Sequence, residues 1–223
     1  MPHMGRPAKK KLRGEMNAFP NVIQYTQSDA KNLQGRWQSQ FKNHNPLILE
    51  LACGKGDYTV ALAELFSDKN FIGVDLKGER IWRGAKTALE KKLTNVLFFR
   101  SYIDHLAEYF SAAEAQEIWI TFPDPHPTTK GARKRLTAPR FLTLYQKILQ
   151  PQGRLRLKTD HEALFDFSLR GLKEAGWQIT EEIRDIYKTT DVAPLLSIQT
   201  TYEKRHLAAG KKIYYLQAVP PEA

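Results

Sequence analysis

The stretch E-I-W-I-T-F-P-D, residues 117–124, contains a strand and the point where that strand ends. Its alternating aromatic and β-branched residues are typical of a buried strand, and Pro123 ends the strand because proline has no N–H to give to a sheet. Asp124 then stands at the carboxyl end, followed by P-H-P at 125–127. The closely spaced prolines restrict φ, so the sequence predicts a rigid carboxylate at the sheet edge. An ordinary proline-rich turn over a core strand is the alternative that these residues leave open.

Apolar, strand-like runs alternate with helical segments along the rest of the chain. This order is typical of a Rossmann-like α/β fold, in which helices cover both faces of a mostly parallel sheet. We predict a seven-stranded sheet with strands at residues 46–52, 70–74, 95–99, 117–122, 154–158, 177–183 and 212–218. Helices are predicted at residues 58–66, 78–91, 106–110, 138–149 and 162–175. A short helix capped by Ser28 and running through Leu33 and Trp37 is expected before the first strand.

The length of 223 residues suits one domain, which we place at residues 17–223 after a basic, flexible tail at 1–16. Residues 1 to about 15 are expected to be disordered, because they are too polar to contribute to a core. No apolar run is long enough to cross a bilayer, and the single Cys53 cannot form an internal disulfide. These features predict a cytoplasmic protein that does not associate with membranes.

The charge of the chain is concentrated in two places. The 34 Lys and Arg residues exceed the 24 Asp and Glu residues, which gives a formal net charge of +10. Residues 1–14 and 128–140 each carry five basic side chains and no acidic one, so they account for the whole excess. Neither stretch has an evident hydrophobic face for insertion into a membrane. The pattern therefore favours a nucleic acid as the partner.

Acidic residues follow the predicted parallel strands. Glu50, Asp75, Asp124 and Asp160 each stand at or just after the end of one strand. In parallel sheets the strand ends meet at one edge, where ligands bind, so these carboxylates are expected to surround a ligand. Like charges brought together there need a ligand or cations between them. The histidines lack the spacing of a metal site, so no metal is predicted.

The turn C-G-K-G-D after the first strand resembles a nucleotide-binding loop. Gly54 and Gly56 suit a tight turn, but Thr59 replaces the third glycine of G-x-G-x-x-G, so the motif alone is weak evidence. Asp75 lies 19 residues after Gly56, where an acid accepts the hydroxyls of an adenosine ribose. NAD and S-adenosylmethionine both contain that ribose. Glu50 favours S-adenosylmethionine, because a carboxylate there would repel a pyrophosphate but attract a sulfonium.

Five motifs in order carry a specific resemblance. L-E-L-A-C-G-K-G-D, I-G-V-D, F-P-D-P-H-P with the run K-G-A-R-K-R-L-T, L-K-T-D, and T-T-Y-E-K-R are together similar to the bacterial tRNA (guanine-N7)-methyltransferase family, over about residues 17–218. The resemblance implies the S-adenosylmethionine-dependent methyltransferase fold. It also implies methylation of N7 of guanosine 46 in the tRNA variable loop.

The resemblance further implies site residues. Asp124 is expected to be the catalytic residue, holding the guanine rather than removing a proton. The expected cofactor-binding residues are Glu50, Gly54, Gly56, Asp75, Tyr102 and Asp124. The expected substrate-binding residues are Lys130, Arg133, Lys134, Arg135, Asp160, Thr200, Glu203 and Arg205.

The chain departs from the family pattern at three positions. The family usually has tryptophan where this chain has His126, and lysine where it has Thr128, so Lys130 is the candidate replacement for that lysine. Tyr102 stands where the family often has an acid or amide that contacts the adenine.

Three other functions are compatible with the residues. P-D-P-H faintly resembles the loop of methyltransferases that act on base amino groups. An NAD-dependent dehydrogenase would use a similar sheet, although the missing third glycine and the basic stretches count against it. A tRNA-binding module without catalysis is the third alternative, and the sequence leaves open whether the protein is a monomer or a homodimer.

Overall fold

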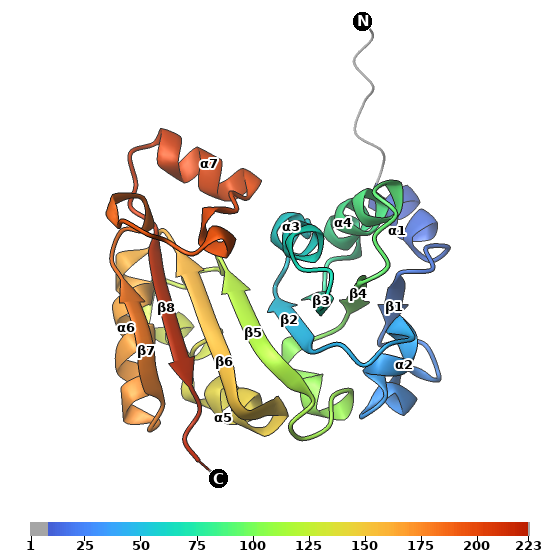
Figure 1. Cartoon of the computed structure of the whole chain (residues 1–223), viewed down its shortest axis with the longest axis horizontal. Coiled ribbons are helices and arrows are strands. Elements are labelled where there is room, and N and C mark those ends of the chain that lie inside the picture. The colour runs from blue at the N-terminus through green and yellow to red at the C-terminus, as the bar shows by residue number, and fades with distance from the viewer. Residues whose placement is uncertain (1–8, 223) are drawn as a thin grey trace, which may run out of the picture.

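The computed structural model describes residues 9–222, apart from the side chains of residues 9–11 and 13 (Figure 1). Eight strands form one sheet in the order β1-β4-β3-β2-β5-β6-β8-β7. Their bounds are β1 Val22–Gln24, β2 Leu47–Leu51, β3 Asn70–Asp75, β4 Val96–Arg100, β5 Ala115–Thr121, β6 Leu149–Thr159, β7 Gln178–Ile183 and β8 Tyr214–Val219. The neighbouring pairs from β1 to β6 are parallel, and β8 runs antiparallel to both β6 and β7.

The predicted α/β class and the mostly parallel sheet are confirmed, but the predicted number of seven strands is one too low. The additional strand is β1, which adds to the edge of the sheet beside β4. Its three residues are too few to show an alternating pattern, so only pairing with β4 identifies it as a strand.

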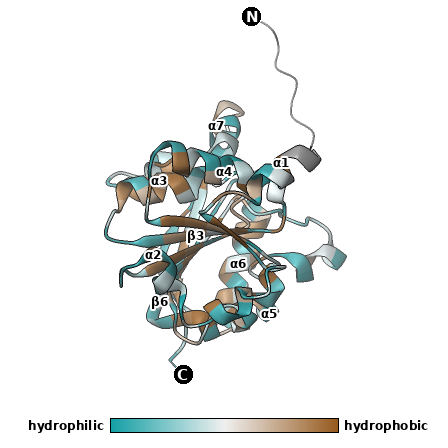
Figure 2. Ribbon diagram, turned by 90° about the vertical axis from the view of Figure 1, so that its right-hand side faces the viewer, coloured by the Kyte–Doolittle hydropathy of each residue, from teal (hydrophilic) through white to brown (hydrophobic). Residues whose placement is uncertain are grey.

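Helices cover both faces of the sheet (Figures 1 and 2). The α-helices are α1 Lys9–Met16, α2 Trp37–Phe41, α3 Asp57–Leu65, α4 Gly78–Glu90, α5 Pro139–Ile148, α6 Glu162–Glu174 and α7 Thr201–Ala208. Buried side chains of α2, α5 and α6 pack on one face of the sheet, and those of α1, α3 and α4 on the other. Short 3₁₀ helices lie at η1 Ala30–Leu33, η2 Ile103–Glu108, η3 Thr129–Lys134, η4 Ile186–Lys188 and η5 Pro194–Ser197.

The prediction of disorder up to about residue 15 is wrong for residues 9–15, which belong to helix α1. Met16 is 1% exposed in the core, and the Trp82 indole of α4 donates a 3.0 Å hydrogen bond to Glu15. Packing on α4 therefore orders a helix that its composition alone would leave unstable. Residues 1–8 of the predicted tail lie outside the described residues. The predicted single helix from Ser28 to Trp37 is instead η1 and the start of α2.

The strand order changes direction between β2 and β5. From β2 the chain continues through α3 to β3 on one side, whereas β5 pairs with the opposite side of β2. Ligands of such sheets bind at the carboxyl ends of the strands beside this point.

A long connection between β7 and β8, residues 184–213, returns to this edge of the sheet and includes η4, η5 and α7. We call it the connecting arm. Among the described residues, no helix is both long and apolar enough to cross a membrane.

Candidate active site

A cavity of about 310 Å³ opens at the carboxyl ends of β2 and β5. It lies beside the point between β2 and β5 where the strand order changes direction. Its walls come from β2 and the turn after it, the loop after β5, and the first turns of α3, α4 and α7. The lining residues are Glu50, Ala52, Cys53, Gly54, Lys55, Asp57, Tyr58, Arg80, Thr121, Phe122, Asp124, Thr200 and Tyr202.

The turn after β2 depends on glycine, as the sequence predicts. Gly54 and Gly56 have φ of 58° and 70°, in the left-handed region. At Gly56 an added Cβ would lie 2.5 Å from the buried ring of Phe98, so no other residue fits unless that ring moves. Asp75 at the end of β3 accepts hydrogen bonds from the backbone N–H of Gly54 at 3.0 Å and of Lys77 at 2.8 Å. Asp75 thus braces this turn, and it does not itself line the cavity.

Glu50 on β2 is the buried carboxylate of the cavity. Its side chain is reached by two hydroxyl donors, Thr59 on α3 and Thr121 at the end of β5. Burial raises the pKa of Glu50 to about 7, and the two threonine hydrogen bonds only partly offset this effect. No Lys, Arg or His among the described residues forms an ion pair with it. Glu50 is therefore a carboxylate without a cation, in contact with a cavity.

Asp124 is exposed at the mouth of the same cavity. Its side chain is 74% accessible, and one of its oxygens accepts the backbone N–H of His126 at 3.2 Å. Phe122 and His126 have φ of 47° and 40°, values that non-glycine residues rarely adopt. The loop is therefore held in an uncommon conformation that presents Asp124 to solvent.

Arg135 supplies part of that restraint. Its guanidinium donates to the carbonyl oxygens of Pro125 and His126, at 3.0 and 3.1 Å, and lies 4.4 Å from the ring centroid of Phe167. The side chain of Arg135 thus holds the backbone of the Asp124 loop, and its contact with substrate phosphate stays a prediction.

The connecting arm forms the wall opposite α4. Thr200 caps α7 by accepting the N–H of Glu203 at 3.1 Å, and both Thr200 and Tyr202 line the cavity. The Thr201 hydroxyl donates to Asp57 at the start of α3 at 2.7 Å. This contact joins the arm to the opposite half of the sheet. Thr200, a predicted substrate-binding residue, lies on the cavity wall, and its contact with substrate stays a prediction.

Glu203 is not on the cavity surface, contrary to the expectation that it accepts hydrogen bonds from the substrate. It is 0% exposed, and Lys158 of β6, also 0% exposed, pairs with it at 2.8 Å. Tyr187 donates a second hydrogen bond to Glu203 at 2.8 Å. Lys158 also donates to the carbonyl oxygens of Leu196 and Ile198. Burial lowers the pKa of Lys158, and Glu203 opposes that shift. The pair fixes the arm to the sheet.

Two more predicted site residues lie outside the cavity. Asp160 after β6 accepts from Lys211 at 2.5 Å and lies 3.2 Å from the ring nitrogen of His206, so its carboxylate already has partners within the arm. Its predicted role as a guanine acceptor stays a prediction. Tyr102 after β4 is 44% exposed and packs edge-on against Tyr25 at 5.5 Å. Its adenine contact stays a prediction.

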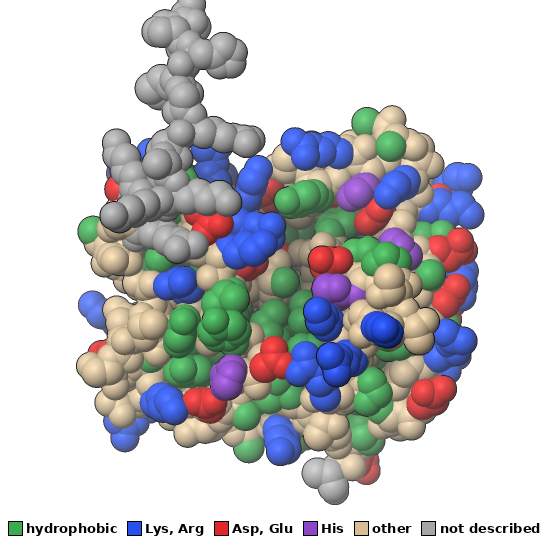
Figure 3. Space-filling model, turned by 180° about the vertical axis from the view of Figure 1, so that it is seen from behind, with side chains coloured by type: hydrophobic (Ala, Val, Ile, Leu, Met, Phe, Trp, Pro, Cys, Tyr) green, Lys and Arg blue, Asp and Glu red, His purple; other side chains and the backbone are tan. Residues whose placement is uncertain are grey.

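Four predicted substrate-binding cations are exposed. Lys130, Arg133 and Lys134 lie on η3, which follows the Asp124 loop, and Arg205 lies on α7. Arg140 of the same basic stretch pairs instead with Asp104. In the view from behind, Lys and Arg side chains gather around a hollow between the two upper lobes of the molecule (Figure 3). No group of three His, Cys, Asp or Glu suitable for a metal occurs in the described part of the chain.

Several residues of the site carry no signal in the sequence strong enough to single them out. In the sequence, Thr59 stands out only as the residue that replaces the third glycine of the motif. The structure shows that its hydroxyl donates a hydrogen bond to Glu50. Lys158 stands within L-K-T-D, but a lysine in a strand does not reveal its partner. Arg80 and Tyr202 line the cavity only because α4 and α7 lie on its opposite sides.

Comparisons with known proteins agree with this geometry. The model of a family described as "Putative methyltransferase" matches residues 44–216. A Christiangramia forsetii protein named tRNA (guanine-N(7)-)-methyltransferase is 45% identical over 219 residues, covering 94% of this chain and 97% of its own. A Cytophaga hutchinsonii protein of the same name is 40% identical over 212 residues, covering 94% and 96%.

The solved structures show a similar fold. The 16S rRNA methyltransferase KamB has a TM-score of 0.64 at 14% identity, covering 84% of this chain and 94% of its own. At that identity the likeness concerns the fold alone. The sequence relatives go further, because their similarity extends over nearly the full length of both chains. This chain belongs to the tRNA (guanine-N7)-methyltransferase family.

Proposed function

We propose that this protein transfers a methyl group from S-adenosylmethionine to N7 of guanosine in tRNA, at position 46 of the variable loop. The main structural support is that one cavity is lined by two carboxylates in different environments, Glu50, which is buried, and Asp124, which is exposed. A relative that is 45% identical and bears the name of this activity supports it.

The residues of the cavity fit S-adenosylmethionine. Glu50 is buried and has hydroxyl partners but no cation among the described residues, which suits a ligand that carries positive charge. Gly54 leaves room for a ligand against the backbone of the turn, and Asp75 lies directly behind it. When bound, S-adenosylmethionine supplies a methyl group on a positively charged sulfur. Glu50 and the turn would hold that ligand, and Asp75 and Tyr102 are the candidates for its adenosine.

Asp124 has a role that requires no proton transfer. Guanine N7 has a lone pair and no hydrogen, so methylation there needs no general base. The purine becomes cationic as it reacts, and a fixed carboxylate beside it stabilises that charge and can accept hydrogen bonds from N1 and N2. The strained loop and Arg135 hold Asp124 in advance, so little ordering is required when the base arrives. Alignment of the reacting atoms can lower a barrier by roughly 7 to 11 kcal/mol.

The exposed cations of η3 and α7 are suited to the phosphates of tRNA. Lys130, Arg133, Lys134 and Arg205 are exposed and are free of ion pairs with the described residues. Their contacts would position the RNA without reading its sequence. We place this reaction in the cytoplasm, and Lys130 is the residue that would replace the lysine the family has at position 128.

The test is a methylation map on unmodified tRNA transcripts with labelled S-adenosylmethionine. N7-methylguanosine makes the strand break after borohydride and aniline, so the modified position can be read from the fragment length. We expect one break, at guanosine 46. Asp124→Asn should lower turnover by about 100- to 1000-fold, the usual cost of removing one preorganised charge-stabilising group.

Asp68→Asn is the matched control, because Asp68 is exposed just before β3, at the opposite edge of the sheet. Label in adenosine or cytosine would show that the enzyme acts on another base. Full turnover by Asp124→Asn would remove Asp124 from the mechanism.

A further inference from the structure

Arg80 is the only arginine among the described residues that line the cavity. It stands in the first turn of α4, four residues before Gly84. At Gly84 an added Cβ would lie 2.7 Å from the carbonyl oxygen of Lys55, so α4 packs directly on the turn after β2. Residues four apart share one face of a helix. Arg80 therefore lies on the face of α4 that packs on this turn, one helical turn before Gly84, and it lines the cavity together with Gly54 and Lys55.

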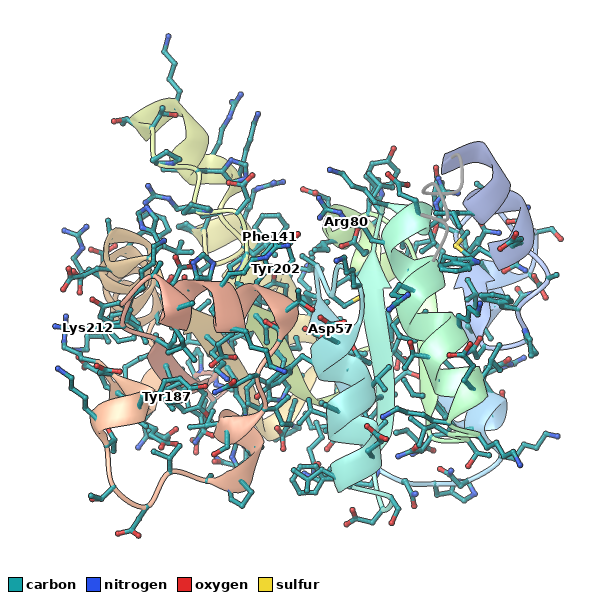
Figure 4. The ribbon with its side chains drawn as sticks, turned by 90° about the horizontal axis from the view of Figure 1, so that it is seen from above. Asp57, Arg80, Phe141, Tyr187, Tyr202 and Lys212 are labelled. Carbon is teal, nitrogen blue, oxygen red and sulfur yellow. The ribbon has the colours of Figure 1, made fainter. Side chains whose placement is uncertain are left out.

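Arg80 and Tyr202 approach the cavity from opposite sides. Viewed from above the carboxyl ends of the strands, Arg80 comes from α4 and Tyr202 from α7, with Asp57 beside the gap between them (Figure 4). Asp75 and Tyr102, the candidates for the adenosine, do not line this cavity. Arg80, Glu50 and Asp124 all line this one cavity, so the amino-acid end of the cofactor and the target base would meet there.

The charges of this cavity are separated. Glu50 is 3% exposed at the floor, and Arg80 is exposed at the rim. Arg80 forms no ion pair or side-chain hydrogen bond with any side chain that the structure describes, whereas Asp57 is bonded to Thr201. A buried acid and an unpaired guanidinium in the lining of one cavity match a ligand that carries both charges, such as an α-amino acid.

We propose that Arg80 binds the carboxylate of the aminocarboxypropyl group of the cofactor, while Glu50 holds its positively charged end. This inference rests on the proposed function and adds a residue to it. The planar guanidinium can donate two parallel hydrogen bonds to a carboxylate, which the ammonium of the neighbouring Lys55 cannot do with the same geometry.

The experiment compares two ligands that differ in one group. S-adenosylhomocysteine carries the carboxylate, and 5′-deoxy-5′-(3-aminopropylthio)adenosine lacks only that group. Calorimetric titration of both ligands into the full-length wild-type protein and into Arg80→Met gives four dissociation constants. We expect Arg80→Met to weaken binding of S-adenosylhomocysteine about tenfold and to leave the aminopropyl ligand unchanged. Arg83→Met, on the same helix but outside the cavity, should change neither.

Each other outcome overturns the inference in a recognisable way. Equal losses for both ligands would show a general effect on the cavity, and no loss for either would show that Arg80 does not contact the cofactor. Loss of tRNA affinity alone would make Arg80 a phosphate ligand. If Lys55→Met, and not Arg80→Met, weakens binding of S-adenosylhomocysteine while leaving the aminopropyl ligand unchanged, then Lys55 binds the carboxylate. A wild-type protein that binds neither ligand would overturn the proposed function itself.

Discussion

The protein buries two glutamates at the same end of the sheet and treats them differently. Glu203 is 0% exposed and is balanced by Lys158 at 2.8 Å. Glu50 is 3% exposed and has two threonine hydroxyls but no cation among the described residues. A buried charge is costly unless it is paired, so a balanced pair serves the fold, whereas an unbalanced acid beside a cavity is kept for a ligand. Burial and pairing, rather than the presence of a carboxylate, separate the structural acid from the functional one.

The largest expected effect comes from breaking the balanced pair. Lys158→Met leaves Glu203 charged, buried and without its cation, and it removes the donor to Leu196 and Ile198. We expect the free energy of unfolding to fall by about 3 to 5 kcal/mol. Urea denaturation followed by circular dichroism measures it.

The double variant Lys158→Met with Glu203→Gln is the control. It removes both charges, so part of the lost stability should return. If Lys158→Met alone costs less than about 1 kcal/mol, the pair does not hold the arm in the way described.

Removing the unbalanced acid should have the opposite effect on stability. Glu50→Gln eliminates a buried charge and keeps a group that both threonines can contact, so at pH 8 the free energy of unfolding should rise by on the order of 2 kcal/mol. Binding of S-adenosylhomocysteine should weaken about 10- to 100-fold, since the amide no longer attracts its ammonium group. Thermal unfolding and calorimetric titration measure the two effects. If Glu50→Gln lowers the free energy of unfolding instead, then Glu50 stabilises the fold as Glu203 does, and the two glutamates do not differ in the way described.

The pH dependence of cofactor affinity tests whether Glu50, unlike Glu203, serves the ligand. The pKa of Glu50 is raised by burial to about 7, and a cationic ligand binds the ionised form. Affinity should therefore increase about tenfold from pH 6 to pH 8. Calorimetric titration at pH 6, 7 and 8 measures it, and the profile of Glu50→Gln should be flat over this range.

The stability of the folded protein depends on the ionisation of Glu50 in the opposite direction to the cofactor affinity: it falls as pH rises. Its pKa in the folded state lies above the unfolded value of 4.5, so the folded protein binds more protons between pH 4.5 and 7. Stability from this group is therefore present at low pH and is lost as pH rises through 7.

The affinity test has a clear negative outcome. A cofactor affinity that does not change between pH 6 and 8 would show that Glu50 is not part of the cofactor site.

The smallest effect concerns the basic N-terminal segment rather than either glutamate. Deleting residues 1–14 removes five positive charges. Each phosphate contact contributes to the salt dependence of RNA binding, so the plot of log affinity against log salt should become less steep. Filter binding of tRNA at several salt concentrations measures the slope. An unchanged slope would show that this segment does not contact the RNA.

Much of the fold could be predicted from local patterns. Alternating apolar strands and helices indicated the α/β sheet, and glycine and proline marked the turns after β2 and β5. Strand β1 and helix α1 could not be predicted, because pairing with β4 and packing on α4 stabilise segments that are short or polar by themselves. The acid at the mouth of the cavity, Asp124, was predicted at its observed place because its loop is local in sequence.

The sequence by itself determined the kind of sheet, the position of the glycine turn and the exposed acid after the proline-flanked strand, since each depends on neighbouring residues. Only the tertiary structure decided which acids stand free and which are paired. Lys158 and Glu203 are 45 residues apart, and Arg80 lies across the cavity from Tyr202 only because the fold places two helices from distant segments on opposite sides of it. Charge balance depends on distance in space, and distance in space follows from the packing of the whole chain.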